Sequence, residues 1–512
     1  MSLTTLPATP LAEVYDVAVI GGGINGVGIA ADAAGRGLSV FLCEKDDLAS
    51  HTSSASSKLI HGGLRYLEHY EFRLVREALA EREVLLAKAP HIVKPMRFVL
   101  PHRPHLRPAW MIRAGLFLYD HLGKREKLAG STSLKFGTDS PLKAEITKGF
   151  EYSDCWVDDA RLVVLNAMAA REKCAHVHTQ TRCVGARRSK GLWELNLERA
   201  DGSLFSIRAK ALVNAAGPWV AKFIKDDLKL DSPYGIRLIQ GSHLIVPKLY
   251  DAPNAFILQN EDQRIVFTIP YMDQFTIIGT TDREYTGDPA KVSITEQETD
   301  YLLNVVNAHF KQQVSRADIL RTYSGVRPLC NDESDNPSAV TRDYTLALSG
   351  VPGEAPLLSV FGGKLTTYRK LAESAMAQLT PYFTQIKPSW TAKATLPGGE
   401  NMTTPQALSA ALTSKYNWLD AAIAKRWAIT YGSRSWNLLE GAQGLDDMGE
   451  HIGSGLYSRE VDYLCTQEWA LDAQDILWRR TKLGLFTTAQ EQERLAQYMA
   501  TLDLKHRKVA AA

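Results

Sequence analysis

The segment that most constrains the fold of this chain begins at Val17 and ends at Glu44. Residues 17–20 form a short apolar run typical of a buried parallel strand, and the following Gly21-Gly22-Gly23-Ile24-Asn25-Gly26 matches the pattern G-x-G-x-x-G. An alanine-rich, helix-like run comes next, and a second apolar run ends at Glu44. This order of strand, tight turn, helix, strand and acid predicts a βαβ unit that holds a dinucleotide.

Each glycine of the motif has its own role in such a turn. Gly21 permits the turn, Gly23 lets the backbone approach a pyrophosphate, and Gly26 lets helix and strand pack closely. The helix N-terminus supplies amide donors, and Glu44 is expected to bind a ribose hydroxyl. The pattern leaves open whether the dinucleotide is a nicotinamide or a flavin. A plain structural crossover is the alternative interpretation.

The composition limits the class of protein. A chain of 512 residues is too long for one core, so two or three domains are expected. A net charge of +2 argues against nucleic acid as the main partner. The six cysteines contain no Cys-x-x-Cys pair, which predicts reduced thiols, and no metal site is expected. The uncharged N-terminus and the lack of a long apolar run predict a cytoplasmic protein, with a membrane surface still possible as its location.

Two polar segments follow the nucleotide acid. Residues 45–58 are rich in serine and threonine, whose hydroxyls suit phosphate or flavin oxygens, although a solvated loop is the alternative. Next, Gly62 and Gly63 stand beside His61, Arg65 and Tyr66. Paired glycines next to polar groups suggest that a ligand approaches the backbone there.

The basic segment that begins at Pro101 and ends at Lys127 has two interpretations. At helical spacing, Arg113, Asp120 and Lys124 share a narrow stripe. The broad apolar face would hold Met111, Ile112, Leu116, Leu118 and Leu122. Such a helix either lies in the surface of an anionic membrane or belongs to the core and has a basic edge. The residues alone leave both open.

The second half of the chain predicts further elements. Residues 235–285 alternate short apolar runs with turns, which indicates an inserted antiparallel sheet, with His243 at the start of one strand. An apolar strand leads into a small-residue turn at Gly217, and residues 357–369 again form strand, glycine turn and helix. A second glycine turn suits a flavin. Residues 395–512 are expected to form a helical cap.

Four long segments together resemble a known family. Residues 20–26, 52–66, 323–329 and 361–368 closely resemble the flavin-dependent, respiratory glycerol-3-phosphate dehydrogenases of aerobic bacteria, and the likeness covers nearly the whole chain. The resemblance implies FAD bound non-covalently and oxidation of sn-glycerol 3-phosphate to dihydroxyacetone phosphate, with electrons passed to membrane quinone. It also implies a homodimer seated on the anionic inner-membrane surface through the segment from Pro101 to Lys127.

The resemblance implies an α/β fold of the glycine/D-amino-acid oxidase type. Its Rossmann-like FAD-binding domain would be discontinuous, comprising residues 12–95, 150–230 and 325–390. A substrate and membrane-facing domain with the antiparallel sheet would comprise residues 96–149 and 231–324, and residues 395–512 would form the C-terminal helical cap. The predicted cofactor contacts are Gly21, Gly23, Asn25, Gly26, Glu44, Thr52, Ser53, Ser57, Lys58, Val184, Gly217, Gly363, Leu365 and Thr366.

The chemistry sets requirements for the substrate site. Oxidation of a secondary alcohol needs a hydride acceptor, a group that takes the hydroxyl proton, and cations for a phosphate dianion. Arg65, Tyr66, Arg342 and Lys364 are predicted at the phosphate.

Three residues are candidates for holding or deprotonating the hydroxyl: His243, Arg327 and His61. The ordinary pKa of histidine favours His243 as the base, with Arg327 polarising the alkoxide. An oxygen-reducing oxidase of the same fold is the nearest alternative function. A non-redox, nucleotide-binding membrane scaffold is the alternative from another class.

Overall fold

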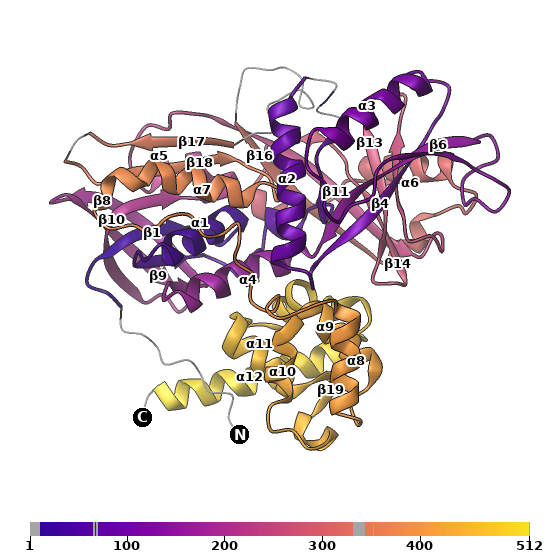
Figure 1. The fold of residues 1–512 in the computed structure, drawn as a ribbon. Helices are drawn as coiled ribbons and strands as arrows, with labels where there is room; N and C mark the ends of the chain where they lie inside the picture. Colours follow the sequence, from indigo (N-terminus) through magenta and orange to yellow (C-terminus); the bar gives the residue numbers. More distant parts are fainter. Residues whose placement is uncertain (1–10, 65–66, 68–69, 331–343, 352, 511–512) are drawn as a thin grey trace.

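The computed structural model describes residues 11–64, 67, 70–330, 344–351 and 353–510. Two large sheets stand side by side and a helical C-terminal region lies below both of them (Figure 1). Among the described residues, no helix is both long and apolar enough to cross a membrane.

The first sheet contains the predicted nucleotide unit. Its strand order is β17-β18-β10-β1-β2-β7, and β8 and β9 extend it from β10. The core strands β1, β2, β7, β10 and β18 pair in parallel, whereas β17 is antiparallel to β18. The bounds are β1 (Tyr15–Ile20), β2 (Val40–Cys43), β7 (His176–His178), β8 (Thr181–Ser189), β9 (Leu192–Arg199), β10 (Leu204–Asn214), β17 (Tyr344–Ser349) and β18 (Leu357–Gly362).

Strand β1 is buried on both faces, which explains its continuous apolar run. Val17 and Val19 pack against the helices α1 (Ile24–Gly35), α4 (Asp159–Glu172) and α7 (Tyr368–Leu379). Ala18 and Ile20 point to the other side, where they share a core with residues of β8, β9 and the short helix α5 (Val220–Asp226). Alternate side chains of one strand therefore join two layers.

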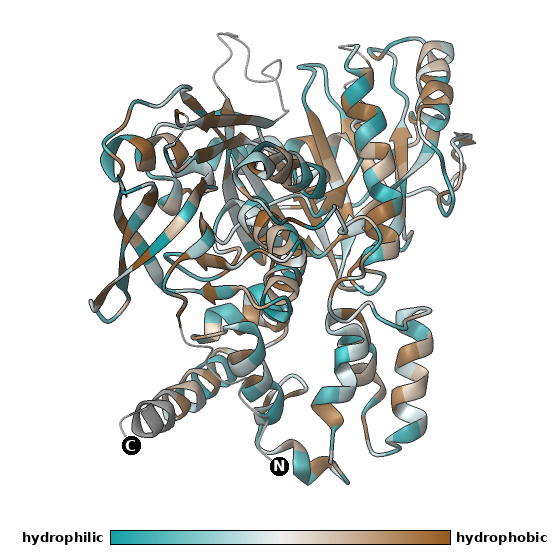
Figure 2. Ribbon diagram, turned by 60° about the vertical axis from the view of Figure 1, so that its left-hand side comes forward, coloured by the Kyte–Doolittle hydropathy of each residue, from teal (hydrophilic) through white to brown (hydrophobic). Residues whose placement is uncertain are grey.

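The second sheet is mostly antiparallel and carries the predicted inserted domain. Its order is β15-β11-β14-β13-β12-β4-β6-β3, with β16 beside β11 and β5 beside β6. In Figure 2 its strands are largely hydrophobic, as expected of a sheet covered on both faces. The bounds are β3 (Leu59–Ile60), β4 (Val93–Pro101), β5 (Thr132–Lys135), β6 (Lys148–Val157), β11 (Ile236–Pro247), β12 (Ala255–Gln259), β13 (Ile265–Tyr271), β14 (Phe275–Gly279), β15 (Arg283–Glu284) and β16 (Arg321–Cys330).

Helices cover both faces of this second sheet. One face shares a core with α2 (Phe72–Lys88) and α3 (Ala109–His121), and the other with α6 (Glu296–His309). Helix α6 begins with a capping box, in which Thr295 and Glu298 satisfy each other's backbone N–H groups. The sheet is thus held between helix layers.

The sheet pairing differs from the predicted domain boundaries at two places. Strand β6 continues past residue 150, yet residues 149–157 pair with β4 in the second sheet. Strand β16 crosses residue 325 and pairs with β11 along its whole length. The physical reason is that both strands pair with partners far away in sequence, so no local pattern tells which sheet each strand joins.

The C-terminal region has its own apolar core. Its helices are α8 (Pro405–Lys415), α9 (Ala421–Thr430), α10 (Ser435–Leu439), α11 (Ser458–Glu468) and α12 (Ala489–Ala510). The sequence predicted a helical cap for residues 395–512. The described part of this region also contains a two-stranded sheet of β19 (His451–Gly453) and β20 (Leu456–Tyr457).

Candidate functional site

A cavity of about 720 Å³ lies where the two sheets meet. One end is formed by the first turn of α1 with Gly23 and Asn25, and the other by α3 with Met111 and Leu118. Between them it is lined by predicted site residues from separate segments: Thr52, Ser53, Ser57, His61, Gly217, His243, Arg327, Gly363, Lys364, Leu365 and Thr366. The fold therefore gathers in one cavity residues spread over more than half of the chain.

The glycine turn between β1 and α1 has a different constraint at each motif position. Gly21 has a φ of +112°, and a Cβ there would lie 2.5 Å from the carbonyl oxygen of Ala215. A Cβ on Gly26 would lie 1.9 Å from the carbonyl oxygen of Gly21, so strand and helix touch there. At Gly23 a Cβ would meet Ser53 Oγ at 3.1 Å, on the side of the cavity. The turn is packed behind Gly21 and Gly26 and open in front of Gly23.

Glu44 follows β2, as the motif predicts, but it lies behind the turn. Its two carboxylate oxygens accept hydrogen bonds from the backbone N–H groups of Gly22 (2.6 Å) and Asp46 (2.9 Å). Burial raises the pKa of this carboxyl, although both backbone bonds oppose the change. In this structure Glu44 therefore holds the loop after β2 against the glycine turn.

Asn25 links the two glycine turns across the cavity. Its side-chain amide donates to the carbonyl oxygen of Gly362 (3.1 Å), while its Oδ1 is buried without a hydrogen-bond partner among the described residues. Gly363 has a φ of +101°, and a Cβ there would lie 2.8 Å from Asn25 Nδ2. A buried acceptor without a hydrogen bond costs about 1–3 kcal/mol. Asn25 Oδ1 is therefore suited to accept a hydrogen bond from a cofactor.

At one point of the cavity floor the second sheet presents two glycines, which have no side chains. Gly241 of β11 pairs directly with Gly325 of β16. A Cβ on Gly241 would lie 2.6 Å from Arg327 Nη2, and one on Gly325 would lie 2.7 Å from Ala55 Cβ. Two facing glycines thus leave a notch, with His243 on one side and Arg327 on the other.

His243 is a buried, neutral imidazole. Its Nε2 lies 2.8 Å from Ser57 Oγ, and its ring stacks on Tyr323 with centroids 4.6 Å apart. Burial lowers the pKa of His243 to about 3, and the nearby charges of Lys58 and Arg327 lower it further. Its Nδ1 has no hydrogen-bond partner within the part of the chain that the structure describes. At neutral pH the ring therefore carries one N–H proton and no charge.

Asp282 and the backbone of Thr281 hold the Arg327 guanidinium in place. Its Nη1 lies 2.6 Å from Asp282 Oδ1, and its Nη2 donates to the carbonyl oxygen of Thr281 (2.8 Å). His61 enters the same cavity from β3, and its backbone N–H donates to Thr366 Oγ1 (3.3 Å), on the loop that carries Lys364. Arg327 on β16 of the second sheet and Lys364, which follows β18 of the first sheet, therefore both line one cavity.

Several predicted site residues have other surroundings. Lys58 is buried beside Asp159, with its Nζ 2.7 Å from Asp159 Oδ1, and it does not line this cavity. Val184 lies on β8 in the outer layer of the first sheet. Gly21 and Gly26 lie behind the turn together with Glu44, as described above. Arg65, Tyr66 and Arg342 lie outside the described residues.

Sequence reasoning missed Asp282 and Tyr323 as parts of the site. Asp282 follows β14 at the end of a small-residue run, and Tyr323 opens the predicted motif that includes Arg327. The only available signal was their position beside motif residues, and it does not reveal that one pairs with Arg327 and the other stacks on His243.

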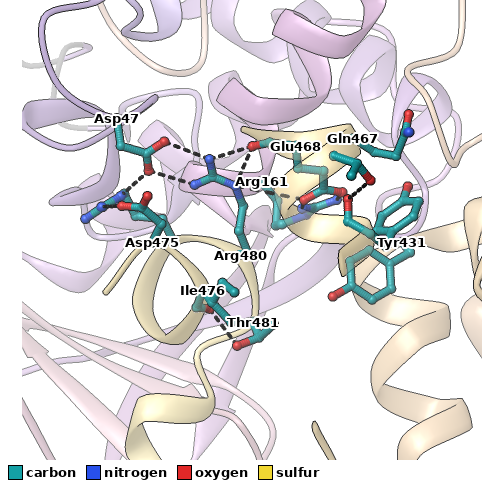
Figure 3. Close-up of polar contacts among 12 residues, drawn as sticks. Asp47, Arg161, Tyr431, Gln467, Glu468, Asp475, Ile476, Arg480 and Thr481 are labelled. Atoms are coloured by element: carbon teal, nitrogen blue, oxygen red, sulfur yellow. Dashed lines mark hydrogen bonds and ion pairs between the residues drawn. The ribbon is translucent and has the colours of Figure 1, made fainter. Parts of the chain in front are cut away.

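The C-terminal region contacts the loop after β2 and helix α4 through buried ion pairs (Figure 3). The Arg480 guanidinium donates to both carboxylate oxygens of Asp47, at 2.8 and 2.7 Å, and to the carbonyl oxygen of Glu468. Arg161 of α4 donates in turn to the Glu468 carboxylate (2.9 Å). Asp47 belongs to the loop that Glu44 holds, so this contact reaches the nucleotide unit.

These features define a dinucleotide-binding protein with a Rossmann-like domain and an adjoining cation-lined cavity. The residues fit FAD, which would be held by the open face of Gly23, the unmet Asn25 Oδ1, the hydroxyl-rich loop with Ser53, and the second glycine turn. The family model described as "FAD dependent oxidoreductase" matches residues 16–369, and that described as "C-terminal domain of alpha-glycerophosphate oxidase" matches residues 389–506.

The chain belongs to the family of FAD-dependent oxidoreductases, and FAD is its cofactor. It is 80% identical over all of both chains to a "Glycerol-3-phosphate dehydrogenase" of Pseudomonas tolaasii. It is 61% identical to the "Aerobic glycerol-3-phosphate dehydrogenase" of Escherichia coli K12, over 95% of this chain and 97% of that one. The resemblance predicted from the sequence is thereby confirmed, and the non-redox scaffold is excluded.

A solved structure supports the same fold. The glycerol-3-phosphate dehydrogenase of Bacillus halodurans, complexed with FAD, superposes with a TM-score of 0.76 at 28% identity. The alignment covers 96% of this chain and 90% of that one. The predicted α/β fold of the glycine/D-amino-acid oxidase type is confirmed.

Proposed function

We propose that this protein oxidises sn-glycerol 3-phosphate to dihydroxyacetone phosphate and passes the electrons to membrane quinone. The observation that carries the proposal is the notch over Gly241 and Gly325, where His243, Arg327 and Lys364 line one cavity. Bound FAD supplies the hydride acceptor for carbon 2 of the alcohol. A phosphate dianion needs cations with several donors, and the guanidinium and ammonium groups supply them.

His243 is our candidate for the group that takes the hydroxyl proton. Its Nε2 already lies within hydrogen-bond distance of a hydroxyl, that of Ser57, and its Nδ1 is unpartnered. A pKa of about 3 makes the free imidazole a weak base. A phosphate dianion held nearby would raise that pKa, because negative charge favours the imidazolium. Substrate binding would thus prepare its own base, and Arg327 would stabilise the developing alkoxide.

The apolar end of the cavity supports a lipid-soluble acceptor. It is lined by Leu64, Leu67, Met111, Ile112 and Leu118, and α3 forms its rim. A quinone ring and its isoprenoid tail require such a surface, whereas the phosphate of the substrate requires the opposite, cationic end. The two ends of one cavity would therefore serve two substrates of different polarity.

Helix α3 is our candidate for the membrane contact. Leu116 and Tyr119 pack into the core, while Trp110 and Phe117 are 70% and 58% exposed. Arg113 and Asp120 are not a solvated stripe, because both bond to Ser131. The outward face is therefore more apolar than the sequence pattern predicted. We propose a homodimer on the cytoplasmic side of the inner membrane, with this face and its basic flanks from Pro101 to Lys127 against anionic lipid.

An oxygen-reducing oxidase remains the second candidate, because the C-terminal match is to the domain of an oxidase family. One experiment tests both. Glycerol 3-phosphate is added without oxygen to the purified FAD-loaded protein, and flavin absorbance is followed before reoxidation by a short-chain quinone or by oxygen. We expect bleaching and faster reoxidation by quinone. Flavin that stays oxidised would refute the substrate, and faster reoxidation by oxygen would favour the oxidase.

A further inference from the structure

A second cavity, of about 220 Å³, lies behind the wall of the first. Its lining comes from the loop 50–58, from β11, β13 and β16, and from the C-terminal region at Trp478, Arg479, Lys482 and Leu485. The two cavities share Thr52, Ala55 and Gly325 in their walls. All three parts of the fold therefore meet at this cavity.

The lining has basic side chains and lacks acidic ones. Among the described residues around it are Lys58, Arg321, Arg479, Lys482 and His51, whereas no aspartate or glutamate lines it. Three of the cations are neutralised from outside the cavity, Lys58 by Asp159, Lys482 by Asp158 and Arg479 by Asp47. His51 Nε2 likewise lies 2.6 Å from Asp46 Oδ2.

Arg321 is the cation without such a counter-ion. Its guanidinium lies over the Trp478 ring, with Cζ 3.2 Å from the ring centroid, and no aspartate or glutamate is among the described residues that line the cavity around it. Burial lowers the pKa of Arg321. A half-buried guanidinium held flat by an aromatic ring keeps its donors directed at the space beside it.

The cavity also offers one neutral donor. Ser50 Oγ is buried without a partner among the described residues, whereas the hydroxyls of Ser54 and Ser324 already donate to the carbonyl oxygen of His51 (3.3 Å) and to Ser242 Oγ (2.9 Å). Lys58 Nζ uses two of its three donors, on Asp159 and on the carbonyl oxygen of Ser54. Donors that converge from several sides suit a tetrahedral anion with several acceptor oxygens.

We propose that this cavity is a second anion site, which binds a small anion of the phosphate class between Arg321, Ser50 and Lys58. It is separate from the substrate phosphate site, which Lys364 would help to form across the shared wall. Inorganic phosphate and a small phosphate monoester present the same chemistry, and the volume admits either. The inference does not depend on which alcohol the enzyme oxidises.

The test is calorimetric titration of the FAD-loaded protein with inorganic phosphate and, separately, with methyl phosphate. Lys364→Ala serves as the background because it removes phosphate binding at the proposed substrate site. We expect one remaining phosphate per chain in that variant. Adding Arg321→Gln should weaken this binding about tenfold or more, since a charge-assisted hydrogen bond is lost.

The matched control is Arg264→Gln in the same background. Arg264 also stacks on an aromatic ring, with Cζ 3.8 Å from the Tyr301 centroid, but it lies outside the cavity. Arg321→Lys keeps the charge and should keep part of the affinity, and the flavin spectrum reports folding in every variant. No binding in Lys364→Ala, or equal effects of Arg321→Gln and Arg264→Gln, would overturn the proposal. Tighter binding of methyl phosphate would identify a monoester as the ligand class.

Discussion

At the scale of single residues, His243 has the most specific environment in the cavity. It is held by one hydroxyl and one stacked ring, and its burial leaves it neutral. We predict that His243→Asn slows flavin reduction by glycerol 3-phosphate by about 10²-fold or more in a single turnover, as expected when a positioned base is lost.

The control for that prediction is His309→Asn. His309 is also buried, with its Nδ1 2.8 Å from the carbonyl oxygen of Val305, but it lies on α6 away from the cavity. Stopped-flow absorbance should give the parental rate for this control. Equal rates in both variants would remove His243 as the base.

Some individual residues of the site could be predicted from the sequence and others could not. Gly21, Gly23 and Gly26 could be assigned, because a local pattern fixes their roles and the structure has the corresponding contacts. The pairing of Arg327 with Asp282 could not, because Arg327 lies on β16 and Asp282 in the loop after β14, and no local pattern joins them. Lys58 was assigned to the cofactor from its neighbours, yet it is buried beside Asp159, which is 101 residues away in sequence.

At the scale of elements, Lys88 ties the end of α2 to the segment that enters the C-terminal region. Its Nζ donates to the carbonyl oxygens of Thr391 and Ala394, each at 3.0 Å. Burial lowers the pKa of Lys88 from 10.5 to about 8. Between about pH 8 and 10.5 the unfolded chain binds the proton and the folded chain does not, so this group adds stability as pH rises.

We therefore predict that the thermal midpoint of the parent rises relative to Lys88→Met between pH 7.5 and 9.5. Lys222→Met, at an exposed position on α5, should show a pH-independent difference from the parent. Differential scanning calorimetry at both pH values measures this. A difference between parent and Lys88→Met that does not change with pH would contradict the shifted pKa.

The ion pairs of Figure 3 join elements from two parts of the chain. Arg480 is fully buried, and its loss leaves Asp47 with one fewer cation. We predict that Arg480→Ala lowers the thermal midpoint of the FAD-loaded protein by about 3–5 °C, since breaking a buried pair costs about 3–5 kcal/mol. Arg316→Ala removes an exposed pair with Glu296 and Asp300 and should leave the midpoint unchanged.

Elements were easier to predict than their partners. The βαβ unit of β1, α1 and β2 follows from hydrophobic periodicity and turn residues, which act over a few positions. Strands β6 and β16 pair with strands far away in sequence, so their sheet membership was not predictable. Helix α3 shows the same limit, because its Arg113 and Asp120 found a partner in Ser131.

At the scale of the whole molecule, the exposed face of α3 stands apart from the C-terminal region (Figure 1). We predict that the double change Trp110→Ser and Phe117→Ser weakens binding to phosphatidylglycerol vesicles about tenfold or more, because two large apolar side chains no longer leave water. Co-sedimentation measures the effect. Leu204→Ser, which alters a leucine 71% exposed on β10, should bind as the parent does. Parental binding by the double variant would refute the proposed contact.

The paired glycines of β11 and β16 have a consequence for changing the enzyme by design. Any side chain added at Gly241 would displace Arg327, and any at Gly325 would press on the loop at Ala55. The floor therefore cannot be varied without damage to the residues beside it. A library meant to accept longer polyol phosphates should leave both glycines fixed and randomise other lining positions, at Leu64 and Ile257, where residues already line the cavity.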